Sequence, residues 1–263
     1  MGREEERLAR TAVDALLAEA ELTPEPGLPD ARDSDISALR WSARSLAPGF
    51  AAMAAARRTG EPTRTLREEL GAIGRCTERS MTVANGGTPL HHGAVWPLGL
   101  LVASAALVRG TGVNDITAMA RQLAMFPDRR APRRPTTGSA VATRYGAAGA
   151  RGEARAGFPH VRRATAALGK ARGAGLCEPQ ARLDALLTVM STLQDTGLLH
   201  TGGPHGLREV QNGARAVLDA GGTGTEAGWQ ALQDFDRHLR TRNLSPRGSA
   251  QLLAAALFVD FLR

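Results

Sequence analysis

The chain has 263 residues, of which 43% are hydrophobic and 22% charged, and this is long enough to bury a substantial core. Its formal net charge of +7 favours an anionic partner, such as nucleic acid, a membrane surface or a phosphate-rich small molecule. Cys76 and Cys177 are the only cysteines and lie far apart, which excludes a disulfide framework and a zinc site of the CxxC type.

Neither a secretory signal nor a membrane span is indicated. The chain opens MGREEERLAR, which is charged from its start and has no apolar run of the signal type. The longest apolar stretch, residues 94–108, contains Pro97 and Gly99 and is shorter than the roughly 20 residues that a spanning helix needs. We therefore expect a cytoplasmic protein with no membrane partner.

The distribution of basic residues argues against nucleic acid as the anionic partner. Of the 33 basic residues only Lys170 is a lysine, which is typical of a genome-wide preference for arginine codons. The basic residues are also mixed with 26 acidic ones. The densest cluster, DRRAPRR at residues 128–134, falls in a proline-containing loop, where a solvated surface is the ordinary interpretation.

Helical periodicity returns along almost the whole chain, whereas aromatic residues make up only 4% and no segment alternates as a strand would. In chain order the predicted helices cover residues 4–20, 35–46, a segment opened by Pro48, about 62–84, 92–109, 115–125, 160–172, 179–194, 206–220, 226–240 and 246–262. Ser34 is placed to cap the second helix. Short glycine and proline segments connect the helices. The predicted fold class is all-α, a single-domain multi-helix bundle over residues 1–263.

Glycine-containing segments interrupt this pattern and place polar residues at helix boundaries. Helix ends leave backbone groups free and helix N-termini favour anions, so several ends gathered at one mouth would form a polar, phosphate-compatible pocket. The standard motifs GxxxxGK[ST], GxGxxG after a strand, and GxSxG are all missing. His91 and His92 are adjacent and would point about 100° apart on a helix, so they cannot form a metal face like that of HExxH.

Five of these segments form a recognisable series. RYGAAGARGEARAGFP at residues 144–159 contains YGxxGARGEAxxGFP without a gap. PEPGLPD at 24–30, PLHHGAVWPLGLL at 89–101, DTGLLHTGG at 195–203 and SPRGSAQLLA at 245–254 are similar to PKPGLVD, NTHKGAxxSLGLL, DTNxLxRGG and SPGGSADLLA. Together they resemble the triphosphoribosyl-dephospho-coenzyme A synthases, the family that makes the prosthetic-group precursor of citrate lyase and malonate decarboxylase. The resemblance spans nearly the whole chain.

The resemblance implies an unusual use of ATP. In the family, the ribose 2′-hydroxyl of 3′-dephospho-coenzyme A attacks C1′ of the ATP ribose, adenine leaves, and the triphosphate stays on the transferred sugar. This chemistry needs a group that accepts the hydroxyl proton, cations that hold the triphosphate, and stabilisation of the charge that develops at C1′. Mg²⁺ held by a few carboxylates is the usual way to fix a triphosphate.

The same resemblance suggests which residues form the site. The expected catalytic residues are Glu153, Asp195 and His91. The expected Mg²⁺ ligands are Glu153, Asp195 and Asp35. The sequence does not determine whether Glu153 and Asp195 each act as the general base or as a metal ligand. The expected nucleotide and phosphate contacts are Arg151, Gly149, Gly152, Ser249 and His92, because an arginine fork suits phosphate oxygens and glycine lets the backbone approach them.

Each of these residues also has a purely structural interpretation. Arg151 and Glu153 would form an exposed ion pair in a glycine loop, His91 would be a hydrogen-bonded histidine at a helix start, and Ser249 would be a helix cap. The choice between the two interpretations stays open at the level of the sequence.

Several positions depart from the family pattern. The residues found there are Glu25 and His92 in place of lysines, Thr201 in place of arginine, Gly197 in place of asparagine, Gln251 in place of aspartate and Asp33 in place of histidine. Losing cations around a ligand with about four negative charges is expected to weaken or redirect binding.

Three functions therefore stay open. The chain catalyses the family reaction, or it keeps the nucleotide pocket but uses another acceptor or has lost catalysis, or it is a basic helical nucleic-acid-binding module. Its oligomeric state is open as well.

Overall fold

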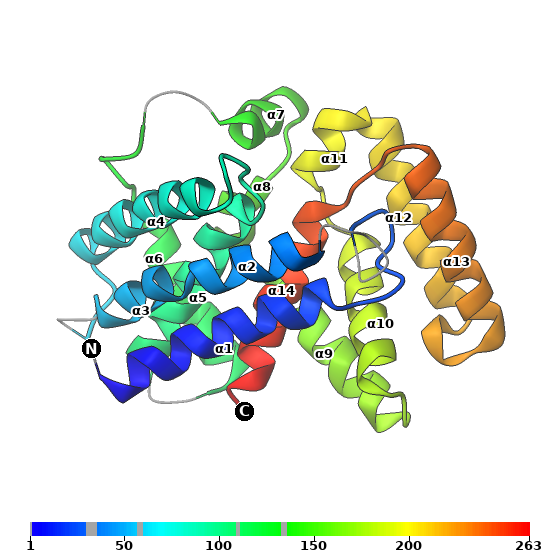
Figure 1. Ribbon diagram of the computed structural model, residues 1–263, viewed down its shortest axis with the longest axis horizontal. Coiled ribbons are helices and arrows are strands. Elements are labelled where there is room, and N and C mark those ends of the chain that lie inside the picture. The colour runs from blue at the N-terminus through cyan, green and yellow to red at the C-terminus, as the bar shows by residue number, and fades with distance from the viewer. Residues whose placement is uncertain (1, 30–35, 57–59, 109–110, 133–135) are drawn as a thin grey trace.

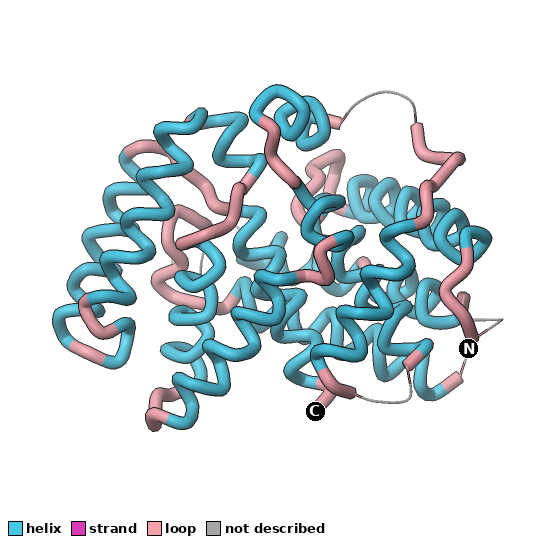
Figure 2. Tube along the Cα trace, turned by 180° about the vertical axis from the view of Figure 1, so that it is seen from behind, coloured by secondary structure: helices cyan, strands magenta, loops and turns pink. Residues whose placement is uncertain are grey.

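The computed structural model describes residues 2–29, 36–56, 60–108, 111–132 and 136–263, and within these ranges every regular element is a helix (Figures 1 and 2). The predicted all-α class is therefore confirmed. The helices are α1 (Arg3–Ala20), α2 (Ile36–Ser45), α3 (Ala47–Ala55), α4 (Arg64–Ala84), α5 (His92–Leu107), α6 (Val113–Met125), α7 (Thr137–Tyr145), α8 (Gly149–Arg155), α9 (Pro159–Gly173), α10 (Glu178–Met190), α11 (Thr196–Thr201), α12 (Gly203–Asp219), the 3₁₀ turn η1 (Gly222–Gly224), α13 (Glu226–Thr241) and α14 (Arg247–Phe261).

Two apolar helices, α5 and α14, occupy the centre of the fold. Most side chains of α5 from Ala94 onward and of α14 from Ser249 onward are buried. The two helices pack against each other, α1 and α9 also pack on α14, and α3, α4 and α6 pack on α5. On the right of the view α10 packs on α9 and α14, and α12 and α13 lie beyond it (Figure 1). A helix that is apolar on nearly all faces is stable only when other helices surround it, and this explains the central position of α5 and α14.

Two segments that the sequence suggested as glycine-rich loops are largely helical. Residues 144–159 contain the end of α7, all of α8 and the start of α9. Gly146 (φ 67°) and Gly157 (φ 79°) have left-handed backbone conformations at the ends of α7 and α8, so the glycines divide the segment into short helices. Residues 196–201 form α11 because the Asp195 side chain caps its first turn.

Other predicted boundaries differ by a few residues. The helix expected from Pro48 begins at Ala47, and the one expected from residue 62 begins at Arg64, after Thr63, whose side chain accepts a hydrogen bond from the Leu66 N–H. The predicted helix 179–194 ends at Met190. The predicted Ser34 cap lies outside the described residues.

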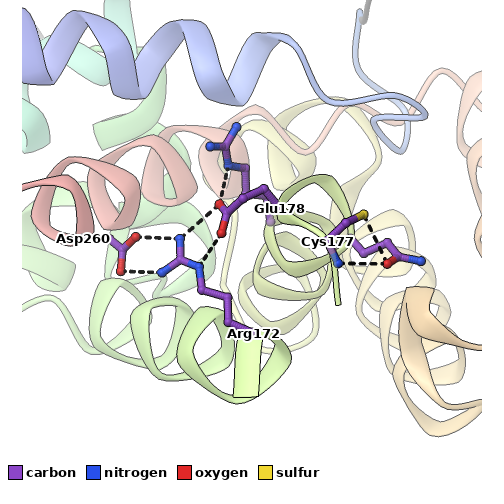
Figure 3. Close-up of polar contacts among 6 residues, drawn as sticks. Arg172, Cys177, Glu178 and Asp260 are labelled. Carbon is purple, nitrogen blue, oxygen red and sulfur yellow. Dashed lines mark hydrogen bonds and ion pairs between the residues drawn. The ribbon is translucent and has the colours of Figure 1, made fainter. Parts of the chain in front are cut away.

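One polar cluster holds three helix ends together (Figure 3). Arg172 near the end of α9 donates to both carboxylate oxygens of Glu178 at 2.6 and 3.1 Å, and to both of Asp260 on α14 at 3.0 and 2.8 Å. Bidentate arginine–carboxylate pairs are among the stronger polar contacts in proteins. The cluster fixes the start of α10 and the last turn of α14 against the end of α9.

Candidate functional site

A cavity of about 80 Å³ opens where the N-terminal ends of α5 and α14 meet α8 and the segment before α11. We call it the first cavity. Its wall includes Glu153 and Gly149 of α8, Asp195 before α11, and Gly248 and Gln251 of α14. The structure thus brings together Glu153, Asp195 and Gly149, three predicted site residues from two separate parts of the chain.

Glu153 is held in place by the turn that follows it. Its side chain is buried, and its two carboxylate oxygens accept hydrogen bonds from one residue, His160. Oε1 accepts from the His160 backbone N–H at 2.9 Å, and Oε2 lies 2.7 Å from His160 Nδ1. Phe158, which is fully buried, has a left-handed φ of 53° at this turn. Such a conformation is strained for a bulky residue and persists only where the surroundings enforce it.

His160 was not among the residues expected from the sequence. Its only sequence signal is its position directly after the GFP of the glycine-rich motif, at the second position of α9. Its Nε2 atom is buried and makes no hydrogen bond to any residue that the structure describes. If Nδ1 carries the ring proton and donates it to Glu153, Nε2 is left as a bare acceptor.

Asp195 joins two helix N-termini. Its Oδ1 accepts from the N–H groups of Gly197 and Leu198 at 2.8 and 3.3 Å, and its Oδ2 accepts from the N–H of Ser249 in α14 at 3.2 Å. Burial raises the pKa of the Asp195 carboxyl above its usual range, and the backbone hydrogen bonds oppose that rise. The carboxyl is therefore a buried acid in the cavity wall that also has a structural role.

Ser249 contributes backbone to this arrangement. Its N–H is the donor to Asp195, and its side chain is 1% exposed. The Ser249 Oγ atom is buried without a hydrogen bond to the residues that are described. The alternative role as a helix cap is therefore not observed among the described residues, and Ser249, predicted as a nucleotide contact, lines neither this cavity nor its neighbour.

The predicted phosphate-contacting residues of α8 lie at different positions around the helix. Gly149 lines the first cavity with a left-handed φ of 59°, and Gly152 faces Ala148, whose Cβ would lie 2.6 Å from any Cβ added there. Arg151 is exposed and does not line the cavity. Its charge, with those of neighbouring arginines, contributes to lowering the pKa of Arg67, for which burial is the larger cause. No ion pair between Arg151 and Glu153 is present.

A second cavity, of about 150 Å³, lies beside the first. Gln251 lines both, and its amide covers Gly93 so closely that a Cβ on Gly93 would lie 2.5 Å from it. The wall of the second cavity also includes His91, Glu19, Glu25 and Arg247. Glu25, which stands where the family pattern has a lysine, is thus a buried acid in the wall of the second cavity, with 1% of its surface exposed.

His91 and His92 have different surroundings. His91 is buried, its Nδ1 lies 2.8 Å from Ser42 Oγ, and burial lowers its pKa to about 4. It is therefore neutral near pH 7. His92 is exposed, 3.8 Å from Glu78, and lines neither cavity.

The remaining departures have local roles. Gly197 donates to the Asp195 cap, and the exposed Thr201 donates from its hydroxyl to the Gly197 carbonyl. The predicted metal ligand Asp35 and the departure Asp33 lie outside the described residues.

The carboxylates around the first cavity fit a hard cation such as Mg²⁺ that takes most of its ligands from phosphate and water. In the described ranges no three His, Cys, Asp or Glu side chains converge as a metal cage would require. Glu153 and Asp195 nevertheless present two carboxylates to one cavity. Mg²⁺ bound to a nucleotide usually takes one or two protein carboxylates, with phosphates and water as its other ligands. Within the same ranges, no helix has the length and apolarity that crossing a membrane requires.

Comparison with known proteins covers almost the entire chain. The model of the family described as CitG, ATP:dephospho-CoA triphosphoribosyl transferase, matches residues 5–263. A Pseudomonas fluorescens Pf-5 protein is 48% identical, over 97% of this chain and 91% of its own length. An Azotobacter vinelandii DJ protein is 47% identical, over 98% of this chain and 91% of its own length. Each is named as a probable 2-(5''-triphosphoribosyl)-3'-dephosphocoenzyme-A synthase. No solved structure matches the chain.

Proposed function

Because the chain belongs to the CitG family of ATP:dephospho-CoA triphosphoribosyl transferases, we propose that it transfers the 5-triphosphoribosyl group of ATP to 3′-dephospho-coenzyme A. The acceptor oxygen is the ribose 2′-hydroxyl, which forms a bond to C1′ of ATP as the bond from C1′ to adenine breaks. Adenine leaves with the bonding electron pair and takes up a proton, which balances the proton lost from the hydroxyl. The observation that supports this best is the meeting of two buried carboxyl groups, Glu153 and Asp195, in one cavity wall.

Glu153 is the proposed acceptor of the hydroxyl proton. Both of its oxygens are oriented by His160, and each keeps a lone pair that is free of that contact. A carboxylate fixed in this way is available without reorganisation when the hydroxyl approaches C1′. The buried negative charge would also stabilise the positive charge that develops on the ribose.

Asp195 and Glu153 would together hold Mg²⁺, which would neutralise charge on the triphosphate and help to orient it. Asp195 has the additional task of fixing the N-terminus of α14 beside the cavity. The positive ends of α14 and α5 at the same cavity favour an anionic ligand. Arg151, on the exposed face of α8, is proposed to contact the outer phosphates beyond the cavity mouth.

ATP and coenzyme A precursors are cytoplasmic metabolites, so we place the reaction in the cytoplasm. The product would serve as prosthetic-group precursor for a carrier subunit of malonate decarboxylase or citrate lyase, as the family resemblance implies. Glu25 and Gln251, which depart from the family pattern, line the second cavity, so a different acceptor is the alternative that these positions favour.

The test is to mix the purified protein with Mg-ATP and 3′-dephospho-coenzyme A and to follow the products by chromatography with mass detection. We expect free adenine and an acceptor heavier by one triphosphoribosyl group, in equal amounts, and neither product without the acceptor. Adenine that appears only with a different nucleoside acceptor would redirect the proposal to that acceptor. A protein that binds ATP but releases no adenine with any acceptor would overturn it.

A further inference from the structure

The second cavity has the dimensions and wall of a site for a flat, largely apolar ring. It holds about 150 Å³ and lies between the end of α1, the N-terminal parts of α5 and α14, and α2, which crosses near them (Figure 1). Leu16, Leu28, Leu39 and Leu90 supply aliphatic wall. A cavity of this volume accommodates a benzene-sized ring, and Gln251 marks the side on which it adjoins the first cavity.

The polar groups of this wall form a specific pattern. The side chains of Glu19 on α1 and Glu25 are hydrogen-bonded to each other. An ionised carboxylate only accepts hydrogen bonds, so one of the two must carry a proton. The pair therefore presents an O–H donor and carboxyl acceptors close together. Burial also raises the pKa of Glu19 to about 7, which agrees with a shared proton near neutral pH.

His91 adds a second, independent polar group. Its side chain is buried, it lines the cavity, and its Nδ1 is already bonded to Ser42. Ser42 Oγ also accepts a hydrogen bond from Asn85 Nδ2, so the arrangement that satisfies Ser42 has its hydroxyl donating to His91 Nδ1. The ring proton is then on Nε2. That atom has no hydrogen bond to any described residue and is the part of the ring left for a ligand.

From these groups we infer that the second cavity is an adenine-binding subsite, in which the Glu19–Glu25 carboxyl pair recognises the ring edge that carries N1 and the 6-amino group. Adenine presents an acceptor at N1 beside a donor at N6, which complements a carboxyl donor beside a carboxyl acceptor. The aliphatic side chains cover the ring faces. His91 Nε2–H donates to a further ring nitrogen.

Charge shows which part of a nucleotide the cavity takes. Two carboxyl groups that share one proton disfavour a triphosphate beside them, and among the described residues that line the cavity the one arginine is Arg247, which is exposed at its edge. An uncharged base avoids that repulsion, while a phosphate attached to it would reach Arg247. The subsite therefore holds the base and leaves the sugar directed toward Gln251.

This inference rests on the proposed function in one respect, because both substrates of that reaction carry adenine. The ring in the second cavity is either the adenine that leaves ATP or the adenine of the acceptor. In both cases Gln251, shared by the two cavities, would lie near the sugar, with the reacting carbons in the first cavity.

The experiment measures binding of free adenine and of hypoxanthine by isothermal titration calorimetry. Hypoxanthine has an oxygen in place of the 6-amino group and a proton on N1, which reverses the donor and acceptor pattern. We expect adenine to bind at least about tenfold more tightly than hypoxanthine, because the mismatched ring leaves buried polar groups unpaired. Equal binding of the two rings, or no adenine binding to the wild-type protein, would overturn the inference.

Two variants locate that binding. Glu19→Met keeps the side-chain length but removes the carboxyl group, and Leu39→Trp fills the cavity from α2; we expect each to weaken adenine binding at least about tenfold. The matched control is Glu21→Gln, because Glu21 is exposed near the same helix end and its side chain pairs, among the described residues, with Arg40 at 3.4 Å. Helical circular dichroism and melting temperature establish that the variants are folded. Wild-type adenine affinity in both folded variants would contradict the subsite.

Separate titrations with ATP and with 3′-dephospho-coenzyme A identify the source of the ring. A higher Kd for ATP alone in Glu19→Met assigns the cavity to the leaving adenine, and a higher Kd for dephospho-coenzyme A alone assigns it to the acceptor. Both results support the subsite, and unchanged Kd values for both ligands contradict it. Adenine release by the wild-type protein is measured separately, so a failure of the proposed reaction is distinguishable from a failure of the subsite.

Discussion

Both carboxylate oxygens of Glu153 are bound by a single residue, His160, through its backbone N–H at 2.9 Å and its ring Nδ1 at 2.7 Å. The contact crosses the turn between α8 and α9, where Phe158 has a left-handed backbone conformation. The carboxylate therefore has little rotational freedom. Its orientation depends on a short turn and not on the long helices.

Replacing His160 by phenylalanine tests this positioning. The variant keeps the backbone N–H to Oε1 and the ring volume but removes the Nδ1 contact to Oε2. We expect kcat for adenine release to fall about 10- to 100-fold with KM for ATP changed less than about threefold, because a mispositioned base affects the transition state more than binding. Steady-state kinetics with both substrates measure the two constants. A rise of about 10- to 100-fold in KM for ATP with unchanged kcat would show that His160 contributes to substrate binding instead.

Asp195 allows its structural and chemical roles to be separated. Asp195→Asn keeps an oxygen to cap α11 but loses the charge and the acceptor for the Ser249 N–H, so we expect a stability loss of about 1–2 kcal/mol. Asp195→Ala removes every acceptor for three backbone donors, so the expected loss is about 2–4 kcal/mol. Chemical denaturation measures both. Adenine release should fall at least about 100-fold even in the folded asparagine variant, and near wild-type release would limit Asp195 to its capping role.

His91 predicts a pH dependence of stability. Burial lowers its pKa to about 4 from the ordinary 6.5, so the unfolded chain gains a proton below pH 6.5 that the folded chain does not accept. The free energy of unfolding therefore decreases as the pH is lowered from about 6.5 to about 4. Compared with His91→Gln, the wild type should lose about 2 kcal/mol of relative stability between pH 7.5 and pH 5. Denaturation of both proteins at the two pH values measures this difference, and parallel curves would contradict the burial of a neutral ring.

Arg172 offers a variant that affects stability alone. Arg172→Gln removes the charged contacts to Glu178 and Asp260, and it leaves the Asp260 side chain, 8% exposed, without that partner. We expect a loss of about 1–3 kcal/mol and a melting temperature lower by several degrees. Kinetic constants at a temperature where the variant is fully folded should equal those of the wild type. A changed KM would mean that the α9–α14 contact influences the cavities.

The sequence predicted the helical class and several site residues because both depend on local signals. Helical periodicity identifies α1, α4 and α12, and the order of residues in the glycine-rich motif resembles a family pattern that includes Glu153. The same signals could not reveal that α8 is helical, since four glycines in a short segment favour a loop. There the glycines at 146 and 157 end short helices and leave the residues between them free to form one.

Other features depend on contacts between distant segments, which one sequence does not specify. Glu19 lies on a predicted amphipathic helix among other acidic residues, and nothing in its neighbourhood indicates that it meets Glu25 across a cavity. Ser249 was expected to contact the nucleotide or, alternatively, to cap a helix, but its backbone N–H is bound by Asp195, 54 positions earlier. His160 has only its place after the GFP motif as a signal.

Glu153 in the first cavity is proposed to accept the proton on which adenine release depends. The most direct measurement is single-turnover release of adenine by Glu153→Gln, compared with wild type and with Glu226→Gln, a control in the exposed first turn of α13 that lines neither cavity. We predict that Glu153→Gln melts within a few degrees of wild type but releases adenine at least about 1000-fold more slowly. The control should match the wild type. Adenine release by folded Glu153→Gln at the wild-type rate would contradict the account.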